Sequence, residues 1–312
     1  MAGQKDIEGH YDTVGTLHAL RLLDEHGGFP DYTCALFDGD RSKSLKQAQL
    51  DKHTWIFDGL GLGQDLTGKR ILDIGCGWGP ILNAVRERGG EAIGLTLSPG
   101  QVAHCMSHGL DARLLNYKDI AVGQLGQFDG IVSIGAIEHF CGIDEQLAGH
   151  QDDVYRRFFE ICASLLKPGG RLYLQTMTWN DDPPDYRKLS LSAPRDSREA
   201  ILKRLEQLYP NSWPPNGLRQ MQDTSAPYFD FISSKNGRKD YLITLEHWDD
   251  ATKNLLRFDV LPRALKAGVP LLCRALVDKD AWTQLQSIRR GDQYNCFDRG
   301  IMSHERMFFS LK

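Results

Sequence analysis

The sequence predicts an α/β fold in which a mainly parallel sheet carries helices on both faces. Two observations support this prediction. Apolar runs of strand length, at residues 70–75, 91–97, 130–135 and 171–177, alternate with helical patterns, as in parallel sheets with crossover helices. The chain also has 312 residues with 41% hydrophobic and 25% charged residues, which are ordinary values for a globular protein. We therefore expect one domain over residues 1–312.

The predicted elements follow one another from the N-terminus. Residues 1–68 read as helical, with an amphipathic stretch at 47–60, and predict a cap over one end of the sheet. Residues 69–178 form the expected core. The last crossover helix, residues 153–166, stops at a Lys-Pro-Gly-Gly sequence. One face of this helix is apolar: Val154, Phe158, Phe159, Cys162, Leu165 and Leu166.

Residues 179–230 interrupt the alternation and predict an inserted lid. This segment is rich in proline and polar residues, and long connections of this kind often cover a site. Its polarity comes in part from four aspartates: Asp181, Asp182, Asp185 and Asp230. Residues 231–312 are expected to complete the sheet, with a helical pattern at 249–268 and a closing apolar run at 306–311.

Charge and cysteine content exclude several classes of protein. Lys and Arg total 37 against 41 Asp and Glu, so the net charge of −4 argues against a dedicated nucleic-acid binder. No apolar stretch approaches the roughly 20 residues that span a bilayer, and the N-terminus lacks a signal peptide, so we expect a cytoplasmic protein. The seven cysteines show no C-x-x-C pair, which predicts free thiols and no metal site.

The string ILDIGCGWGP joins the first predicted strand to a helix. It contains Asp73, Gly75, Gly77 and Gly79, and glycines at alternate positions let the backbone turn sharply and approach a ligand closely. This D-x-G-x-G-x-G pattern resembles motif I of class I S-adenosylmethionine-dependent methyltransferases rather than the G-x-G-x-x-G of NAD enzymes. A purely structural strand-to-helix turn is the alternative.

Two further strings are suited to the nucleoside part of such a cofactor. Thr96 stands where NAD enzymes place an acidic residue, and the amide of Gln101 can both donate to and accept from a ribose diol. Asn116 can read the adenine edge while the ring of Tyr117 covers its face. Plain packing is the alternative role for Tyr117.

Together with DYTCALF, SLKQAQLDK, SIGAIEHF, DYLITLEHW and FDRGIM, these strings resemble the cyclopropane-fatty-acid synthase family, which includes the mycolic acid cyclopropane synthases. The resemblance extends over nearly the whole chain. It implies a Rossmann-like class I methyltransferase fold and S-adenosylmethionine as cofactor. It assigns cofactor contacts to Tyr32 and Thr33 of the cap, Asp73, Gly75 and Gly77 of the loop, Thr96, Gln101, Asn116 and Tyr117.

The resemblance also implies an anion site. Cys34, Glu138 and Tyr241 fall on family positions that surround a bound bicarbonate ion, thought to act as the base, with Cys34 contributing mainly its backbone. The family usually has a histidine where this chain has Gln175, and glutamine carries no positive charge. Gln175 joins the candidate catalytic residues, but it leaves bicarbonate binding and the identity of the base open.

The implied reaction is methyl transfer to an alkene of an unsaturated lipid or another small molecule, which leaves a carbocation. Aromatic faces such as those of Tyr32, Trp248 and Trp179 can stabilise that cation, and Glu138 supplies negative charge. Loss of a proton from the new methyl group closes a cyclopropane, loss of a proton elsewhere gives a methylene or shifted alkene, and water capture gives an alcohol. The substrate would reach the site from a membrane or an acyl carrier, and the basic run at 289–291 could meet anionic head groups.

Alternatives remain both for the function of the protein and for the roles of single residues. Gln175 and the polar lid favour a small-molecule C- or N-methyltransferase of secondary metabolism, and an inactive cofactor-binding scaffold is the reading from another class. Glu138 could be a buried carboxylate that only ties loops together. We expect His139 to make a structural hydrogen bond to the backbone, outside the catalytic set.

Overall fold

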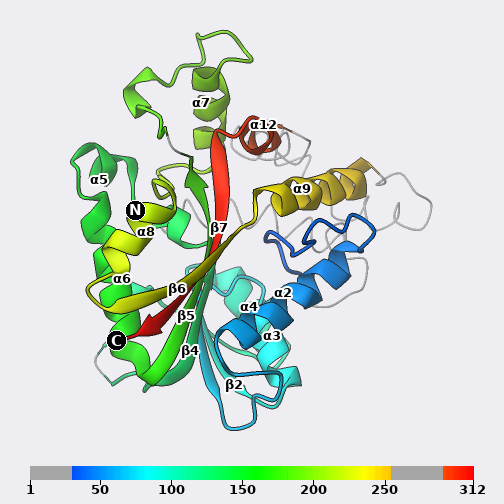
Figure 1. Ribbon diagram of the computed structural model, residues 1–312, viewed down its shortest axis with the longest axis vertical. Coiled ribbons are helices and arrows are strands. Elements are labelled where there is room, and N and C mark those ends of the chain that lie inside the picture. Colours follow the sequence, from blue (N-terminus) through cyan, green and yellow to red (C-terminus); the bar gives the residue numbers. More distant parts are fainter. Residues whose placement is uncertain (1–29, 122, 181, 254–290) are drawn as a thin grey trace.

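The computed structural model describes residues 30–121, 123–180, 182–253 and 291–312. A seven-stranded sheet runs through these residues with the strand order β3-β2-β1-β4-β5-β7-β6 (Figure 1). Its strands are β1 (Arg70–Ile74), β2 (Glu91–Thr96), β3 (Asp111–Leu114), β4 (Phe128–Ile134), β5 (Leu166–Trp179), β6 (Phe229–Asn236) and β7 (Met302–Leu311).

The first five strands of this order are parallel. Leu72 of β1 pairs with Ile93 of β2 on one side and with Ile131 of β4 on the other. β7 runs antiparallel to both of its neighbours, β5 and β6. All four strands that the apolar runs predict are present. β3 was not predicted, because its four residues include only one fully buried position and so give no apolar run.

Helices cover both faces of the sheet, as predicted. Figure 1 shows α2, α3 and α4 on one side and α6 and α8 on the other. The helices are α2 (Leu45–Gly59), α3 (Pro80–Glu87), α4 (Pro99–Ser107), α5 (Ile143–Leu147), α6 (Gln151–Leu165), α7 (Arg198–Leu208), α8 (Gly217–Ser225), α9 (Arg238–Lys253) and α12 (Asp292–Asp298), with the 3-10 turns η1 (Tyr117–Asp119), η2 (Ile137–His139) and η3 (Tyr186–Lys188).

Each face of the sheet has its own hydrophobic core. On one face, Phe158 and Phe159 of α6 are fully buried against strand residues such as Leu172. On the opposite face, Phe57 of α2 packs with Val132 of β4. Full burial of one such side chain contributes about 1.5–3 kcal/mol, so α2 and α6 hold the sheet from both sides. The predicted crossover helix is therefore confirmed, and it ends at Leu165.

The predicted lid range divides into two parts. η3 and α7 lie at the end of the sheet where β5 finishes (Figure 1). α8 instead packs on α6, and its Met221 belongs to the same core as Phe158. β6 already begins at Phe229, within the predicted lid.

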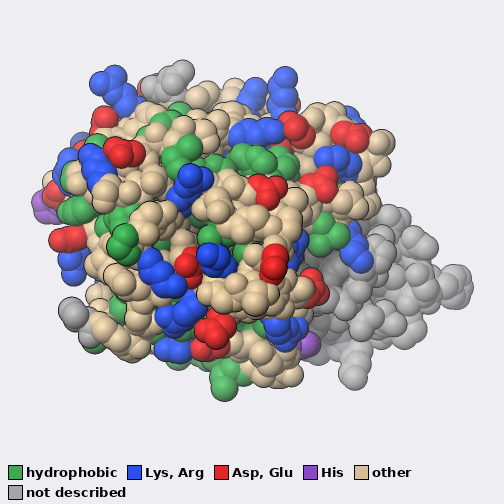
Figure 2. All heavy atoms as spheres, turned by 60° about the horizontal axis from the view of Figure 1, so that its bottom comes forward, with side chains coloured by type: hydrophobic (Ala, Val, Ile, Leu, Met, Phe, Trp, Pro, Cys, Tyr) green, Lys and Arg blue, Asp and Glu red, His purple; other side chains and the backbone are tan. Residues whose placement is uncertain are grey.

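Parts of three predicted segments lie outside the described residues. These are residues 1–29 of the cap, 254–268 of the C-terminal helical pattern and 289–290 of the basic run. Within the described ranges, no helix is both long and apolar enough to cross a membrane. Figure 2 shows Lys and Arg side chains intermixed with Asp and Glu across the face that it presents.

Candidate active site

The glycine-rich loop connects β1 to α3 through left-handed backbone. Gly75, Gly77 and Gly79 have φ of +88°, +54° and +85°, a region that side chains with a Cβ rarely adopt. A Cβ on Gly75 would lie 2.5 Å from the Cβ of Ala136, so this turn also needs glycine for space. Gly79 caps α3, and Pro80 starts the helix, where its lack of an N–H costs nothing.

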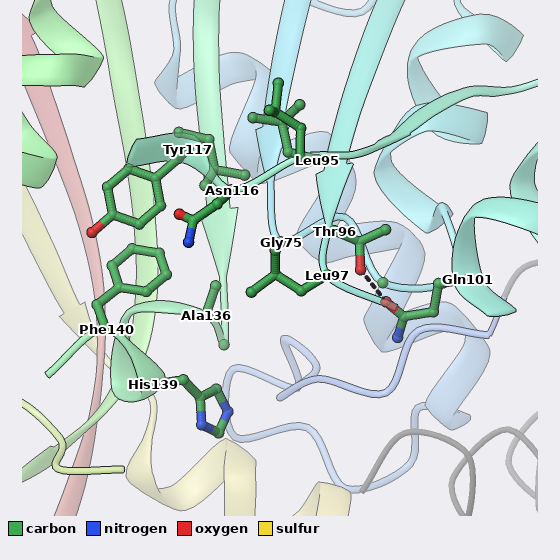
Figure 3. Close-up of a pocket in the computed structure, with 14 residues that line it drawn as sticks. Gly75, Leu95, Thr96, Leu97, Gln101, Asn116, Tyr117, Ala136, His139 and Phe140 are labelled. Carbon is green, nitrogen blue, oxygen red and sulfur yellow. Dashed lines mark hydrogen bonds between the residues drawn. The ribbon is translucent and has the colours of Figure 1, made fainter. Parts of the chain in front are cut away.

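A pocket of about 600 Å³ opens at this loop, at the carboxyl ends of β1, β2 and β4 (Figure 3). Ligands of doubly wound α/β proteins bind in this position. The lining residues are Ile74, Gly75, Gly77, Leu95, Thr96, Leu97, Gln101, Leu115, Asn116, Tyr117, Gly135, Ala136, His139 and Phe140. The loop, ribose and adenine candidates of the sequence analysis are thus brought together around one cavity.

Gln101 presents a free donor to this pocket. The Thr96 hydroxyl donates to Gln101 Oε1 at 2.5 Å, which fixes the amide orientation (Figure 3). Gln101 Nε2 is buried and has no hydrogen-bond partner within the described chain. The N-cap Ser98 accepts from the Gln101 backbone N–H at 3.3 Å and thereby sets where α4 begins. An unpaired buried N–H is costly, so a ligand oxygen is the expected partner.

Asn116 and Tyr117 form another wall of the pocket. Asn116 Oδ1 accepts from the Lys118 N–H at 3.1 Å, which fixes the start of η1. The Tyr117 ring lies 4.4 Å from the Phe140 ring and 5.6 Å, edge-on, from Phe158, measured between centroids. Tyr117 therefore lines the pocket and packs in the core at once, and both roles considered from the sequence are compatible with its position.

Four predicted cofactor residues do not line this pocket: Tyr32, Thr33, Asp73 and Gly79. Tyr32 stacks on Trp248 of α9 with ring centroids 4.3 Å apart, and burial raises its pKa to about 12. Thr33 is hydrogen-bonded to Asp31 and Lys52 instead. Asp73 is buried at the end of β1, and burial, followed by the charge of Asp31, raises its pKa to about 8. Their roles toward a cofactor stay predictions.

A second cavity of about 500 Å³, here called the chamber, lies beside the first. Residues of α7 and its flanks form one side of it. The chamber is lined by Glu138, His139, Met177, Trp179, Leu189, Leu202, Leu205, Glu206, Tyr209, Ser212, Trp213, Pro214 and Met302. His139 lines both cavities, so the two adjoin at η2.

The described aspartates of the predicted lid do not line this chamber. Asp182 pairs with Arg198 at the surface, Asp185 caps η3, and Asp230 is exposed in β6. Asp181 lies outside the described residues. The lining is mainly apolar and aromatic, and the polar side chains that this segment contributes to it are Glu206 and Ser212.

Glu138 is a buried carboxylate with one oxygen unpaired. Its Oε1 accepts from the Met177 N–H at 2.8 Å, and the side chain is 2% exposed. Oε2 has no hydrogen-bond partner among the described residues. Burial raises the pKa of Glu138 to about 7, although the Met177 N–H opposes this shift. A carboxylate that only tied loops together would be expected to use both oxygens.

Tyr241 is connected to Glu138 by a chain of contacts through Gln293 and Met177. The Gln293 amide donates to the Tyr241 hydroxyl at 2.9 Å and also contacts Met177 Sδ at 3.5 Å, and Met177 is the residue that binds Glu138. Gln293 was not singled out from the sequence, because it lies just before the FDRGIM string and α12 meets α9 only through the fold.

Gln175 and Cys34 are bound to each other. Gln175 Nε2 donates to the Cys34 carbonyl at 3.1 Å, and the Tyr173 hydroxyl donates to Gln175 Oε1 at 2.7 Å. The Cys34 thiol lies 3.2 Å from Arg306 Nη2, yet burial raises its pKa to about 11. Cys34 is therefore a packed thiol and a poor nucleophile.

His139 differs from the sequence-based expectation. Its Nδ1 lies 2.8 Å from the hydroxyl oxygen of Ser212, so its partner is a side chain of the segment after α7 and not the backbone. Burial lowers the pKa of His139 to about 4, so the ring is neutral at pH 7.

Comparison with known proteins decides the family. The family described as Mycolic acid cyclopropane synthetase matches residues 2–257. The chain belongs to this family. Among curated proteins, cyclopropane mycolic acid synthase 2 of Mycobacterium bovis is 31% identical over 260 residues, which cover 78% of this chain and 79% of the relative. The resemblance seen in the sequence is thereby confirmed.

Solved structures of the cyclopropane synthase family share the fold. The cyclopropane synthase MmaA2 of Mycobacterium tuberculosis has a TM-score of 0.74 at 24% identity and covers 99% of this chain and 98% of its own. The mycolic acid cyclopropane synthase CmaA1, solved in complex with SAH and CTAB, has a TM-score of 0.73 at 23% identity, with the same coverage. These neighbours confirm the class I methyltransferase fold.

Proposed function

We propose that this protein is an S-adenosylmethionine-dependent C-methyltransferase that acts on the alkene of a lipid-like substrate through a carbocation and closes a cyclopropane ring. One observation carries the proposal. A cofactor-type pocket at the glycine loop adjoins an apolar chamber that contains a buried, half-paired carboxylate, Glu138. Family membership and the names of the relatives, which are cyclopropane synthases, support it.

The residues of the first pocket fit this cofactor. Gln101 Nε2 offers an unpaired donor for a ribose hydroxyl, and a Cβ on Gly77 would meet no protein atom within 4 Å, so the backbone is open to a ligand. Tyr117 and Phe140 supply aromatic surface for an adenine ring. When bound, S-adenosylmethionine supplies an electrophilic methyl group on a positively charged sulfur.

The chamber is suited to an alkene that becomes a cation. Leu202 and Leu205 of α7 exclude water, and the Trp179 and Trp213 rings, 5.2 Å apart, present π faces. A cation gains about 0.5–2 kcal/mol from such a face. The carboxylate of Glu138 adds a fixed negative charge where little water screens it.

Bicarbonate stays a prediction, and the residues around its expected place do not fit it well. Gln175 is uncharged and uses both ends of its amide on Tyr173 and Cys34, so it offers an anion neither a positive charge nor a free donor. Glu138 and the Cys34 carbonyl are acceptors, and bicarbonate has a single O–H with which to donate to one of them. We derive no step through this ion.

The small-molecule alternative loses one of its two supports. It drew on a polar lid, and the described lid aspartates lie away from the chamber. Contact with a membrane or an acyl carrier, and a cytoplasmic location, stay predictions.

The test is incubation of the purified protein with methyl-labelled S-adenosylmethionine and a monounsaturated phospholipid. Mass spectrometry is expected to show the gain of one CH₂ unit and the loss of the double bond. Transfer of the label to nitrogen or oxygen alone would contradict the proposal. Calorimetry measures cofactor binding separately from the reaction. An inactive cofactor-binding scaffold would bind the cofactor but transfer its methyl group to no substrate.

Gly77→Ala is expected to weaken cofactor binding about tenfold or more, because the new methyl group would occupy pocket space rather than meet protein atoms. Gly63→Ala is the matched control. Gly63 also has a positive φ, +69°, and open space, but it lies outside the pocket, so it carries the same backbone strain of about 1–2 kcal/mol. Equal affinities for the two variants by calorimetry would exclude close approach at the loop.

A further inference from the structure

His139 occupies a position that the proposed mechanism has not used. Among the described residues, it is the one that lines both cavities. Figure 3 shows its ring below Ala136, extending from η2 away from Phe140 and Tyr117. A group at this border lies beside the path from the cofactor to the substrate.

One arrangement of the hydrogen bonds places the hydrogen of His139 on Nδ1. In it the Ser212 hydroxyl donates to the Pro210 carbonyl at 3.3 Å, and its oxygen accepts from His139 Nδ1 at 2.8 Å. A neutral imidazole with its hydrogen on Nδ1 has a lone pair on Nε2. No described residue forms a hydrogen bond to Nε2, which leaves that nitrogen available to a substrate.

The reaction needs a proton acceptor near the transferred methyl group. Ring closure breaks a C–H bond of the new methyl group, and its electron pair forms the third C–C bond at the cationic carbon. A carbocation is so acidic that either a carboxylate or an imidazole is basic enough, so position decides which group acts. The methyl group arrives from the cofactor side, which His139 lines and Glu138 does not.

We propose that His139 Nε2 accepts the proton lost from the methylated carbocation, with Ser212 holding the ring in the required tautomer. This inference rests on the proposed function. The proton moves from carbon to Nε2, the ring becomes an imidazolium, and the carboxylate of Glu138 in the same chamber balances the new charge. Burial holds the pKa of His139 at about 4 in the resting protein, so Nε2 carries no proton when the substrate enters.

His139→Asn tests this role. The asparagine amide nitrogen can take the place of Nδ1 and keep the bond to Ser212, while Nε2 is removed. With labelled S-adenosylmethionine, total methyl incorporation reports the proposed function, and the ratio of cyclopropane to alcohol and alkene products reports the inference. Because His139 lines both cavities, we expect a lower but measurable rate of methyl transfer. The cyclopropane fraction of the products should fall about tenfold or more, since general-base contributions have at least this size.

Ser212→Ala is the second variant and leaves the imidazole in place. Without the hydroxyl the neutral ring can place its hydrogen on either nitrogen, so we expect a smaller shift of the product ratio in the same direction. Methyl transfer with an unchanged product ratio in both variants would overturn the inference and leave the proposed function intact. A wild-type protein that transfers no methyl group to alkenes would overturn the proposed function itself.

Discussion

Glu138→Gln is expected to lower kcat for methyl transfer by about two to three orders of magnitude, with cofactor affinity unchanged. The variant keeps the size of the side chain and an oxygen for the Met177 N–H, but it removes the negative charge from a chamber where positive charge develops. Charge in a water-poor site acts at low effective dielectric, so its loss has a large effect on the transition state. Labelled-methyl transfer under saturating cofactor measures it.

Glu206→Gln is the matched control for this prediction. Glu206 lines the same chamber, but it is paired with Lys203 at 2.8 Å, and its side chain is 18% exposed. Its charge is therefore already compensated and partly solvated, and we expect kcat to change little. Equal losses in the two variants would mean that any acidic residue of the chamber matters, and would contradict a specific role for Glu138.

The raised pKa of Glu138 predicts a pH profile. Because burial raises that pKa to about 7, the carboxylate forms as the pH passes upward through neutrality, and methyl transfer should rise with it. The charged form is disfavoured in the folded protein, so ionisation of Glu138 lowers stability as the pH rises from its unfolded pKa to about 7. Glu138→Gln should therefore lose the pH-dependent rise in activity and resist urea better than the wild type above pH 7. A carboxylate without a role in the reaction would give the urea result but no pH-dependent rise in activity.

The central fold could be predicted from the sequence because buried parallel strands leave a strong local signal. The run at 130–135 is apolar at nearly every position since both faces of β4 are covered. β3 has one fully buried residue and leaves no such run.

The division of the predicted lid, residues 179–230, into two parts was not predictable for a different reason. α8 and α7 are both amphipathic, and nothing local says that Met221 joins the core of the sheet while Leu202 faces a chamber.

The residues of the candidate site likewise include some that the sequence predicts and some that it does not. Gln101 lies in the first turn of the helix that follows β2, and Asn116 comes directly after β3, so a motif in the sequence also fixes their place in space. Ser212 and Gln293 belong to no motif string, and their hydrogen bonds at the site join them to residues 73 and 52 positions away in the chain. Such pairs are set by the tertiary fold, which local patterns do not encode.

Lys52→Met is expected to lower the free energy of unfolding by about 3–5 kcal/mol, because it leaves a buried carboxylate without its counter-ion. Lys52 Nζ lies 2.7 Å from Asp31 Oδ2, and the two side chains are 0% and 7% exposed. His53 contacts the same oxygen at 2.9 Å, and Gln49 Nε2 donates to the Asp31 carbonyl at 3.0 Å. This cluster attaches the segment that carries Tyr32 to α2. Urea unfolding measures the loss.

Adding Asp31→Asn to Lys52→Met should restore most of the lost stability, because the uncompensated charge is then gone. A double variant no more stable than Lys52→Met would show that packing of the lysine stem, rather than charge, accounts for the loss.

The pH dependence of the unfolding free energy gives an independent check. Burial alone would raise the pKa of Asp31, but the charge of Lys52 and the hydrogen bond from His53 outweigh it and lower that pKa. Since the folded pKa lies below the unfolded value of about 3.9, the stability that Asp31 contributes is complete above that pH and declines as the pH falls below it. The wild type should lose this contribution in acid, whereas the double variant has no Asp31 carboxylate to protonate. Its unfolding free energy should therefore fall less steeply below pH 4 than that of the wild type.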